Sequence, residues 1–275
     1  MSQPSNPQVD VVIVVHNAGE LLKPVVDAAA AQAGADHIWV MDAESTDGSA
    51  QAIVDRLPEG HVHNVPNKGF SASNNRGIEL TSAPFVLLLN PDAVLRPGAI
   101  EALVASAEHN PRAGIIGPAV LNPDGTSQAY SWGRYPSLAS FLSLRVWRMA
   151  KRLRGNRQLS PHIPRYTKPV DWVTGACMLV RRSAIEDVGP MDEQFFIYWE
   201  DAEWCHRMHD RGWQVLLEPA ASVIHYRGVS AAPIGFVAQA YRDSLDHYCD
   251  LYGLWGLKAA TRLLRIAHRL AGRER

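Results

Sequence analysis

Residues 85–92 read FVLLLNPD, a run of five apolar residues that ends abruptly in an Asn-Pro-Asp step. A short continuous apolar run is typical of a strand that is buried on both faces of a sheet. Asn90 and Asp92 therefore fall directly after a buried strand. A carboxylate in this place could hold Mg²⁺ or Mn²⁺, hard cations that prefer oxygen ligands, and an Asx-Pro turn accounts equally well for the same residues.

Strands and helices alternate on both sides of this run. Such alternation predicts a parallel α/β sheet with flanking helices. In these sheets ligands bind at the carboxyl ends of the strands, which is where the polar motifs of this chain fall. The expected strands are 9–15, 37–41, 61–65, 85–89 and 114–117, and the expected helices are 20–33, 49–57, 70–80 and 98–109.

The second half of the chain has a different composition. Residues 125–170 contain nine Lys or Arg and no Asp or Glu. Further strands are expected at 172–180, 214–217 and 222–225. A helix is expected to begin at Glu200–Asp201, and a helical tail to run from about 236 to 272. Because we find no internal repeat and no low-complexity linker, one domain with a C-terminal extension is the simplest organisation.

The overall composition excludes several classes of protein. The chain has 275 residues, with 27 Lys and Arg against 28 Asp and Glu, and this balance argues against a nucleic-acid binder. It has no run of 18 apolar residues, so no membrane-spanning helix is expected, and its polar start does not resemble a signal peptide. The three isolated cysteines, Cys177, Cys205 and Cys249, predict free thiols in a reducing cytoplasm.

Two polar segments follow the expected strands of the first half. Asp42 ends one strand and could accept a hydrogen bond from a nucleobase N–H, whereas Asp47 is better explained as a helix cap beside the turn-forming Gly48. The segment 67–77 is rich in Asn and small residues, which let a helix approach a ligand. It contains neither a dinucleotide-binding nor a P-loop glycine pattern.

Two further motifs lie in the second half. The aromatic run 195–199 leads into Glu200 and Asp201 at the start of a helix. Carboxylates at a helix start can simply favour the helix dipole, but aromatic neighbours could also form a partly dry site that makes one carboxylate more basic. His225 follows a strand and is compatible with a structural or a ligand role.

Taken together and in this order, these motifs resemble glycosyltransferase family 2, and within it the bacterial rhamnosyltransferase-like branch. The resemblance covers roughly residues 9–230. It implies an α/β fold of the GT-A type: a mostly parallel central sheet flanked by helices, followed here by a helical extension. The implied boundaries are 1–232 for the GT-A domain, with a nucleotide-sugar half at about 9–120 and an acceptor half at about 121–232, and 233–275 for a C-terminal amphipathic extension.

The resemblance also implies roles for individual residues. Asp201 would be the catalytic base beside Glu200, and Asp92 would bind a metal ion that His225 completes. Asn90 stands where many relatives have Asp, and Asp42-Ala43-Glu44-Ser45 replaces a more usual Asp-Asn-Ala-Ser. The nucleotide-binding residues implied are Val15, His16, Asn17, Asp42, Asn67, Gly69, Asn75, Arg76 and Asn90, and those of the donor-sugar and acceptor pocket are Trp172, Thr174, Gly175 and Trp199.

The implied activity is an inverting, Mg²⁺- or Mn²⁺-dependent sugar transfer in cell-envelope glycan synthesis. The donor would be a dTDP- or UDP-sugar, with dTDP-rhamnose as the first choice, and the acceptor a polyprenyl-linked lipid or a polysaccharide. A non-catalytic sugar-nucleotide-binding or scaffold relative of the same fold is the alternative. A sugar nucleotidyltransferase does not fit, because the Gly-rich nucleotide loop that it needs near the N-terminus is missing.

Two basic segments suggest where the acceptor is found. Lys258, Arg262, Arg265 and Arg269 are spaced as one stripe of a helix, and residues 138–157 mix apolar with basic residues. Such helices can lie on anionic lipid, although a solvated basic face is also common on soluble helices. We therefore expect a cytoplasmic enzyme that is peripheral at the inner face of the plasma membrane. The sequence does not indicate an oligomeric state.

Overall fold

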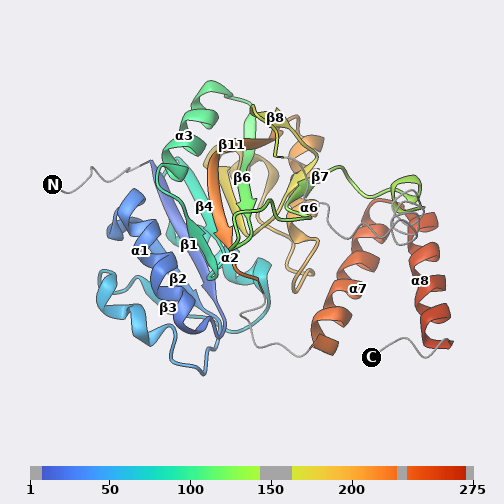
Figure 1. The fold of residues 1–275 in the computed structure, drawn as a ribbon, viewed down its shortest axis with the longest axis horizontal. Helices are drawn as coiled ribbons and strands as arrows, with labels where there is room; N and C mark the ends of the chain where they lie inside the picture. The colour runs from blue at the N-terminus through green and yellow to red at the C-terminus, as the bar shows by residue number, and fades with distance from the viewer. Residues whose placement is uncertain (1–7, 143–162, 228–233, 271–275) are drawn as a thin grey trace.

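The computed structural model describes residues 8–142, 163–227 and 234–270 (Figure 1). Within these ranges the centre of the molecule is a curled, mixed sheet of nine strands. Their spatial order is β3-β2-β1-β4-β10-β6-β11-β5, with β8 beside β11. The strands are β1 (Val9–Val15), β2 (Ile38–Asp42), β3 (Val62–Asn64), β4 (Phe85–Leu89), β5 (Ala93–Leu95), β6 (Ala113–Leu121), β8 (Lys168–Pro169), β10 (Cys177–Arg181) and β11 (Gln214–His225).

The direction of the strands decides which ends of the chain segments meet. β3, β2, β1 and β4 are parallel, as predicted, and β6 is parallel to β11. Between these groups, β10 runs antiparallel to both β4 and β6. The carboxyl ends of β1, β2, β4, β6 and β11 therefore share one edge of the sheet with the amino end of β10.

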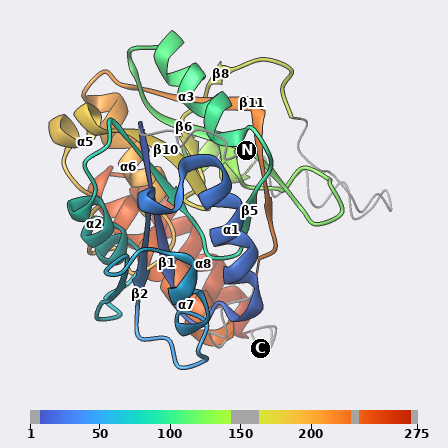
Figure 2. The ribbon, with the colours of Figure 1, turned by 90° about the vertical axis from the view of Figure 1, so that its left-hand side faces the viewer.

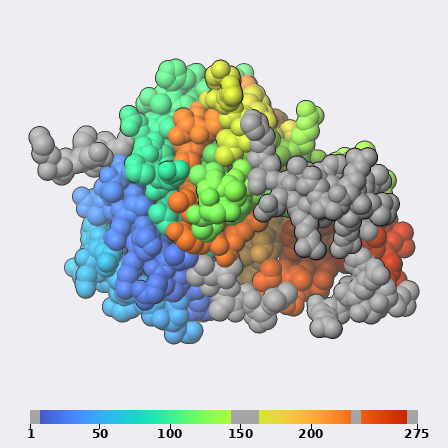
Figure 3. Space-filling view, in the orientation of Figure 1, coloured from blue at the N-terminus to red at the C-terminus, as the bar shows by residue number. Residues whose placement is uncertain are grey.

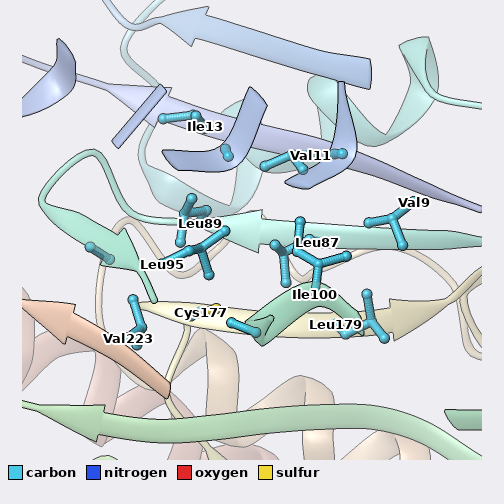
Figure 4. Packing of buried hydrophobic residues seen from close by; sticks show 14 of the residues in the cluster. Val9, Val11, Ile13, Leu87, Leu89, Leu95, Ile100, Cys177, Leu179 and Val223 are labelled. Atoms are coloured by element: carbon cyan, nitrogen blue, oxygen red, sulfur yellow. The ribbon is translucent and has the colours of Figure 1, made fainter. Parts of the chain in front are cut away.

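Helices cover both faces of this sheet and bury two cores (Figures 1 and 2). Because side chains alternate along a strand, Val11 and Ile13 of β1 face α1 (Leu22–Ala33) and α3 (Ala99–His109), whereas Val12 faces α2 (Phe70–Leu80) and α6 (Glu200–Asp210). Figure 4 shows the first core, in which aliphatic side chains from β1, β4 and β10 lie together. Each such buried side chain contributes about 1.5–3 kcal/mol.

Close packing of α2 fixes where that helix begins. A Cβ atom at Gly77 would overlap the side chain of Val12 on β1, so only glycine allows α2 to lie this near the sheet. The start of α2, at Gly69 and Phe70, is thereby held at the shared edge of the sheet.

Several predicted elements differ in the structure. The strand expected at 172–180 is two strands, because the chain turns at Thr174–Ala176: β9 (Trp172–Val173) pairs with β7 (Trp132–Gly133) in a separate small sheet, and β10 joins the main sheet. The two strands expected at 214–225 are one strand, β11, with an irregular register between Glu218 and Ser222. The helix expected at 49–57 is the 3₁₀ helix η3 (Gln51–Arg56), and neither β5 nor α5 (Arg182–Val188) was predicted.

The predicted helical tail is a hairpin of α7 (Ile234–Leu251) and α8 (Trp255–Leu270), at the right of Figure 1. The chain turns at Gly253, whose positive φ of 63° suits glycine, and the N–H of Leu254 donates to the carbonyl of Cys249 (2.8 Å). No helix within the described ranges is long and apolar enough to cross a bilayer. The three cysteines are free, as predicted, and all three are buried.

The basic residues of α8, which were predicted to contact lipid, form ion pairs with α7. Lys258 forms an ion pair with Asp250, and Arg262 and Arg265 both pair with Asp246, at 2.9 and 2.7 Å. The stripe therefore joins the two helices through ion pairs with α7, and Arg262 remains 56% exposed within its pair. The side chain of Arg269, and the basic residues of 138–157, which all lie between 143 and 157, fall outside the described residues.

Candidate active site

The end of β1 is joined to the end of β2 by side-chain hydrogen bonds. His16 Nδ1 lies 2.7 Å from the carbonyl oxygen of Ala43, so this nitrogen carries the proton. The side-chain oxygen of Asn17 accepts from the N–H of Thr46 (2.8 Å), and its Nδ2 lies 3.3 Å from His16 Nε2. These hydrogen bonds hold the end of β1, at Val15, His16 and Asn17, against the loop that follows Asp42.

Asp42 lies in the wall of a cavity of about 380 Å³. One of its oxygens accepts from the N–H of Ser45 (3.0 Å), which leaves the second carboxylate oxygen available to a ligand. Asp47 accepts instead from the N–H groups of Ser49 and Gly19. The predicted capping role is wrong, because the helix that follows, η3, begins after Ala50 and has no side-chain cap. Other residues around the cavity are Ser45, Gly48, Gly60, Val62 and Asn64.

The segment 67–76 is only partly at this edge. Asn67 Nδ2 lies 3.4 Å from His16 Nδ1, which places Asn67 beside the end of β1. Asn75 is buried, and its amide binds the backbone of Met191 in both directions (2.9 Å each) and Glu193. Arg76 pairs with Glu79 at 2.7 Å on the exposed side of α2. Asn75 and Arg76, predicted to bind the nucleotide, are therefore engaged within the protein.

The start of α2 touches the aromatic loop before the acidic pair. The N–H of Phe70 donates to the carbonyl of Phe196 (2.7 Å), and a Cβ at Gly69 would overlap the same carbonyl. Gly69 also has a positive φ of 101°, so a side chain is disfavoured for two reasons. The loop at 195–199 is thus hydrogen-bonded to the start of α2, at the shared edge of the sheet.

Asp92 and His225 meet as the sequence predicted. Asp92 Oδ1 lies 3.1 Å from His225 Nε2, and the backbone carbonyl of Asp92 accepts from the N–H of Tyr226 (3.0 Å). β5, directly after Asp92, pairs with the end of β11 and brings the two residues together. Asn90 Oδ1 is buried nearby in sequence and has no hydrogen-bond partner in the described parts of the chain.

Asp201 is fixed by two backbone N–H groups. Its Oδ2 accepts from Gly175 (2.9 Å) and its Oδ1 from Ala202 (2.7 Å). A Cβ at Gly175 would lie 3.2 Å from the ring of Phe70, so this glycine joins the start of α2 to the acidic pair. Gly175 was predicted to line the sugar pocket, and the structure places it directly against the candidate base.

Burial disfavours the ionised form of both acidic side chains, Glu200 and Asp201. It raises the pKa of Asp201, and the N–H groups of Gly175 and Ala202 only partly oppose that shift. Glu200 is 5% exposed, and burial and the neighbouring Asp201 charge raise its pKa well above the ordinary value. Glu200 Oε2 has no hydrogen-bond partner among the residues described. A raised pKa is what a general base needs in order to take a proton near neutral pH.

The aromatic run before the pair packs against the C-terminal hairpin. Tyr198 and Trp199 both have positive φ, 71° and 70°, which is uncommon for side chains of this size. The Trp199 ring contacts Tyr241 and Tyr248 of α7, with centroids 5.8 and 5.2 Å away, and Ser244 donates to the carbonyl of Ile197 (2.9 Å). Trp199, predicted as a pocket residue, therefore packs on α7, and the hairpin supports the turn that presents Glu200 and Asp201.

The small sheet β7-β9 carries the remaining predicted pocket residues. Trp172 Nε1 donates to the carbonyl of Arg134 (3.1 Å), and the N–H of Thr174 donates to the carbonyl of Ser131 (2.9 Å). Because Thr174 immediately precedes Gly175, this sheet sets the position of the loop that contacts Asp201.

The chain matches the model of the family described as "Glycosyl transferase family 2" over residues 10–189, well over half of its length. The match contains the ends of β1, β2 and β4 and the loop at Gly175. The chain belongs to glycosyl transferase family 2. The resemblance that the motifs indicated is confirmed, and this chain is a glycosyltransferase.

Relatives of this family 2 chain include several rhamnosyltransferases. It is 31% identical, over 79% of its own length and 76% of the relative's, to N-acetylglucosaminyl-diphospho-decaprenol L-rhamnosyltransferase of Mycobacterium tuberculosis. It is 25% identical to rhamnosyltransferase WbbL of Escherichia coli, over 75% of this chain and 74% of that one. These relatives support the predicted rhamnosyltransferase-like branch.

Solved structures confirm the GT-A fold of this family 2 chain. One is GalNAc-T7 with UDP, GalNAc and Mn²⁺, with a TM-score of 0.61, 17% identity, and coverage of 87% of this chain and 47% of the other. Another is the mannosyltransferase PcManGT of Pyrobaculum calidifontis with GDP-Man and Mn²⁺, with a TM-score of 0.56, 14% identity, and coverage of 89% and 66%. At these identities the likeness concerns the fold alone, and the chain spans about half to two thirds of these structures.

Sequence reasoning missed one residue of the site in this glycosyltransferase. Gln128 is 2% exposed and its Oε1 lies 2.8 Å from His225 Nδ1. Figure 3 shows the segment that follows β6 (green) beside β11 (orange) on one face of the molecule. The available signal was the Asn-Pro-Asp-Gly turn at 122–125, because an Asp-Gly step after a strand indicates that the chain folds back toward its neighbours.

Proposed function

We propose that this glycosyltransferase moves a sugar from a nucleoside-diphosphate donor to an acceptor hydroxyl in one displacement, with inversion at the anomeric carbon. The observation that carries the proposal is the fixed, desolvated Asp201 at the edge of the sheet that also holds Asp92 and His225. Its raised pKa suits a group that removes a proton from a hydroxyl. The neighbouring Glu200 also has a raised pKa, but it is Asp201 whose two carboxylate oxygens accept from the N–H groups of Gly175 and Ala202.

The residues at the shared edge of the sheet would each have a separate role in the reaction. Asp42 accepts from the nucleobase with its available oxygen, and His16 and Asn17 shape the wall beside it. Asp201 takes the proton of the acceptor hydroxyl as the new bond forms, and Gly175 holds the carboxylate in place through its N–H. Burial and the Asp201 charge raise the pKa of Glu200 well above its ordinary value, which favours placing the negative charge of the pair on Asp201.

A divalent cation fits the donor atoms of this site. Asp92 and His225 supply an oxygen and a nitrogen 3.1 Å apart, and Asn90 Oδ1 is a buried acceptor without a partner in the described chain. Within the described ranges no group of three His, Cys, Asp or Glu gathers, at this site or at any other, so diphosphate and water would complete the shell, as is common for Mg²⁺. When bound, Mg²⁺ or Mn²⁺ would neutralise the charge on the departing nucleoside diphosphate.

We infer a dTDP- or UDP-sugar donor, with dTDP-rhamnose first, because the relatives at 31% and 25% identity are rhamnosyltransferases. The acceptor we propose is a polyprenyl-linked or polysaccharide glycan of the cell envelope, since the Mycobacterium tuberculosis relative is named for a diphospho-decaprenol substrate. Residues 9–120 would bind the donor and 121–232 the acceptor, with 233–275 as the extension.

We propose that the extension rests on the cytoplasmic surface of the plasma membrane through an apolar face, rather than through its paired cations. Trp255, Leu263 and Ile266 on α8 are 64%, 67% and 53% exposed. Their spacing of eight and three residues puts them on one side of the helix. An exposed stripe of this kind enters the interface of a bilayer, where a lipid-linked acceptor would be found.

Wild-type protein is expected to sediment with liposomes, and the double variant Leu263→Glu, Ile266→Glu to stay in solution. Two charges on the exposed face oppose burial in the interface but leave the pairs with Asp246 intact. The control is Tyr166→Glu, which places a charge on an exposed aromatic side chain (80%) outside the hairpin. Absence of wild-type binding to anionic or neutral vesicles at low salt would remove the membrane proposal.

Calorimetric titration with dTDP, UDP and GDP tests the proposed reaction class. We expect one of these nucleotides to bind with Mn²⁺ and to lose most of its affinity when a chelator removes the metal, because diphosphate and Mn²⁺ would bind together beside Asp92. The preferred nucleotide identifies the class of donor. If folded protein binds none of them, the alternative of a non-catalytic relative is favoured and the proposed transferase reaction is wrong.

A further inference from the structure

The His225 side chain is held from behind by a buried amide. Gln128 Oε1 lies 2.8 Å from His225 Nδ1, and Gln128 Nε2 donates to the backbone carbonyl of the same histidine (3.0 Å). The Gln128 amide therefore contacts both the ring and the backbone carbonyl of His225. Gln128 is 97 residues away in sequence, and the parallel pairing of β6 with β11 brings it there.

Backbone chemistry fixes the orientation of this amide. A backbone carbonyl oxygen can only accept a hydrogen bond, so the Gln128 atom that faces the carbonyl of His225 must be the nitrogen. The same nitrogen donates to Asn122 Oδ1 (3.1 Å). Exchanging the amide oxygen and nitrogen would set two oxygens against each other at both contacts. The oxygen of Gln128 therefore faces His225 Nδ1, which must carry a proton.

A chain of directed hydrogen bonds supports the amide. Asn122 Nδ2 donates to Thr126 Oγ1 (2.9 Å), so the Asn122 oxygen is the atom left for Gln128. The Thr126 hydroxyl in turn donates to Asp124 Oδ1 (2.6 Å), and Asp124 as a carboxylate can only accept. Each step leaves the next group one allowed role, from the carboxylate of Asp124 to the ring of His225.

We propose that Gln128 is the positioning residue that fixes the tautomer of His225. With the proton on Nδ1, the neutral ring presents the lone pair of Nε2 to Asp92 Oδ1, 3.1 Å away. A lone pair and a carboxylate oxygen at this separation repel unless a cation or a proton lies between them. The tautomer set by Gln128 is therefore the one that a metal ligand needs, and histidine ligands commonly donate the other ring N–H to such a partner.

The family resemblance implied a metal site at Asp92 and His225 but nothing about Gln128, so the inference deepens the proposed function and rests on its divalent cation. The consequence for binding is specific: loss of the Gln128 acceptor should leave the ligands present and weaken their grip on the metal. Residues of this kind typically change metal affinity by about 10–100-fold.

The test begins with metal-free wild-type protein that carries ¹⁵N-labelled histidine. Long-range ¹H–¹⁵N spectra, recorded at rising pH until the ring is neutral, report which nitrogen of His225 carries the proton, and the spectrum of His225→Gln assigns its signals. We expect a protonated Nδ1 and an unprotonated Nε2. A neutral His225 with its proton on Nε2 would overturn the proposal whether or not the protein binds a metal.

The variant Gln128→Leu is expected to mix the two tautomers and to bind Mn²⁺, in the presence of the preferred nucleoside diphosphate, about 10–100-fold more weakly by electron paramagnetic resonance. Ser131→Ala is the matched control, because its hydroxyl donates to the backbone of Gln128 (3.0 Å) without touching the amide. Folded Gln128→Leu with wild-type Mn²⁺ affinity would contradict the positioning role. Wild-type protein without Mn²⁺ binding would instead refute the proposed metal, while the tautomer result stands by itself.

Discussion

Asp201→Asn is expected to lower kcat for sugar transfer by about 10²–10⁴-fold, the usual contribution of a general base. The amide cannot take a proton from the acceptor hydroxyl. Donor affinity should change little, because the proposed nucleoside contacts lie at the ends of β1 and β2, whereas Asp201 binds Gly175 and Ala202. The measurement compares kcat for transfer with the dissociation constant for the nucleotide.

Glu200→Gln is the matched control for that variant. It makes the same change from carboxyl to amide at the adjacent residue, where burial and the Asp201 charge raise the pKa and disfavour the ionised form. We expect it to retain most of its activity. If both variants lose activity equally, a structural role of the pair explains the loss and Asp201 is not the base. Near-normal turnover of Asp201→Asn would lead to the same conclusion.

The pH dependence of kcat gives the Asp201 assignment a second readout. Only the ionised carboxylate can accept a proton, so transfer is expected to fall as pH decreases through the pKa of Asp201. Because burial raises that pKa, the acid limb should lie at higher pH than an ordinary aspartate would give. This limb should be absent from the residual activity of Asp201→Asn.

Asp92→Ala is expected to weaken Mn²⁺-dependent nucleotide binding by more than about 100-fold, which exceeds the loss typical of residues that only orient a ligand. The change removes an oxygen ligand and leaves His225 Nε2 without its partner at 3.1 Å. Calorimetric titration with nucleotide and Mn²⁺ measures the effect.

Asp187→Asn is the control for Asp92→Ala, since it removes the charge of a half-exposed carboxylate on α5. Nucleotide binding in the absence of metal should be similar in wild-type protein, Asp92→Ala and this control. Unchanged metal dependence in Asp92→Ala would show that the cation binds elsewhere and that the Asx-Pro turn explains Asp92.

The relation between the hairpin and the acidic pair could not be inferred from sequence. Trp199 and Tyr248 are 49 residues apart, and no periodicity connects an aromatic turn with one face of a helix that follows much later. The same limit explains the stripe on α8. Its spacing was correct, but Asp246 and Asp250 of α7 decide that these cations are paired across the hairpin, and the turn at Gly253 that brings them together was not predicted.

Local sequence patterns were sufficient to predict several strands and helices. The apolar runs at Val9–Val15 and Phe85–Leu89 and the helix at Phe70–Leu80 have their predicted bounds, because period and side-chain volume act over neighbouring residues. The ordered motifs at the ends of these strands were enough to indicate the family. Asp42, Asp92 and Asp201 lie where parallel strands and their loops share an edge, as the α/β pattern requires.

The contacts that position those residues come from parts of the chain that are distant in the sequence. The antiparallel insertion of β10 brings Gly175 against Asp201, and the pairing of β6 with β11 brings Gln128 against His225. The tertiary structure also showed that Asn75 binds Met191 and that Trp199 packs on α7. Hydrogen bonds and burial act through space with geometric precision, so partners that are distant in the chain are set by strand order and packing and not by any local pattern.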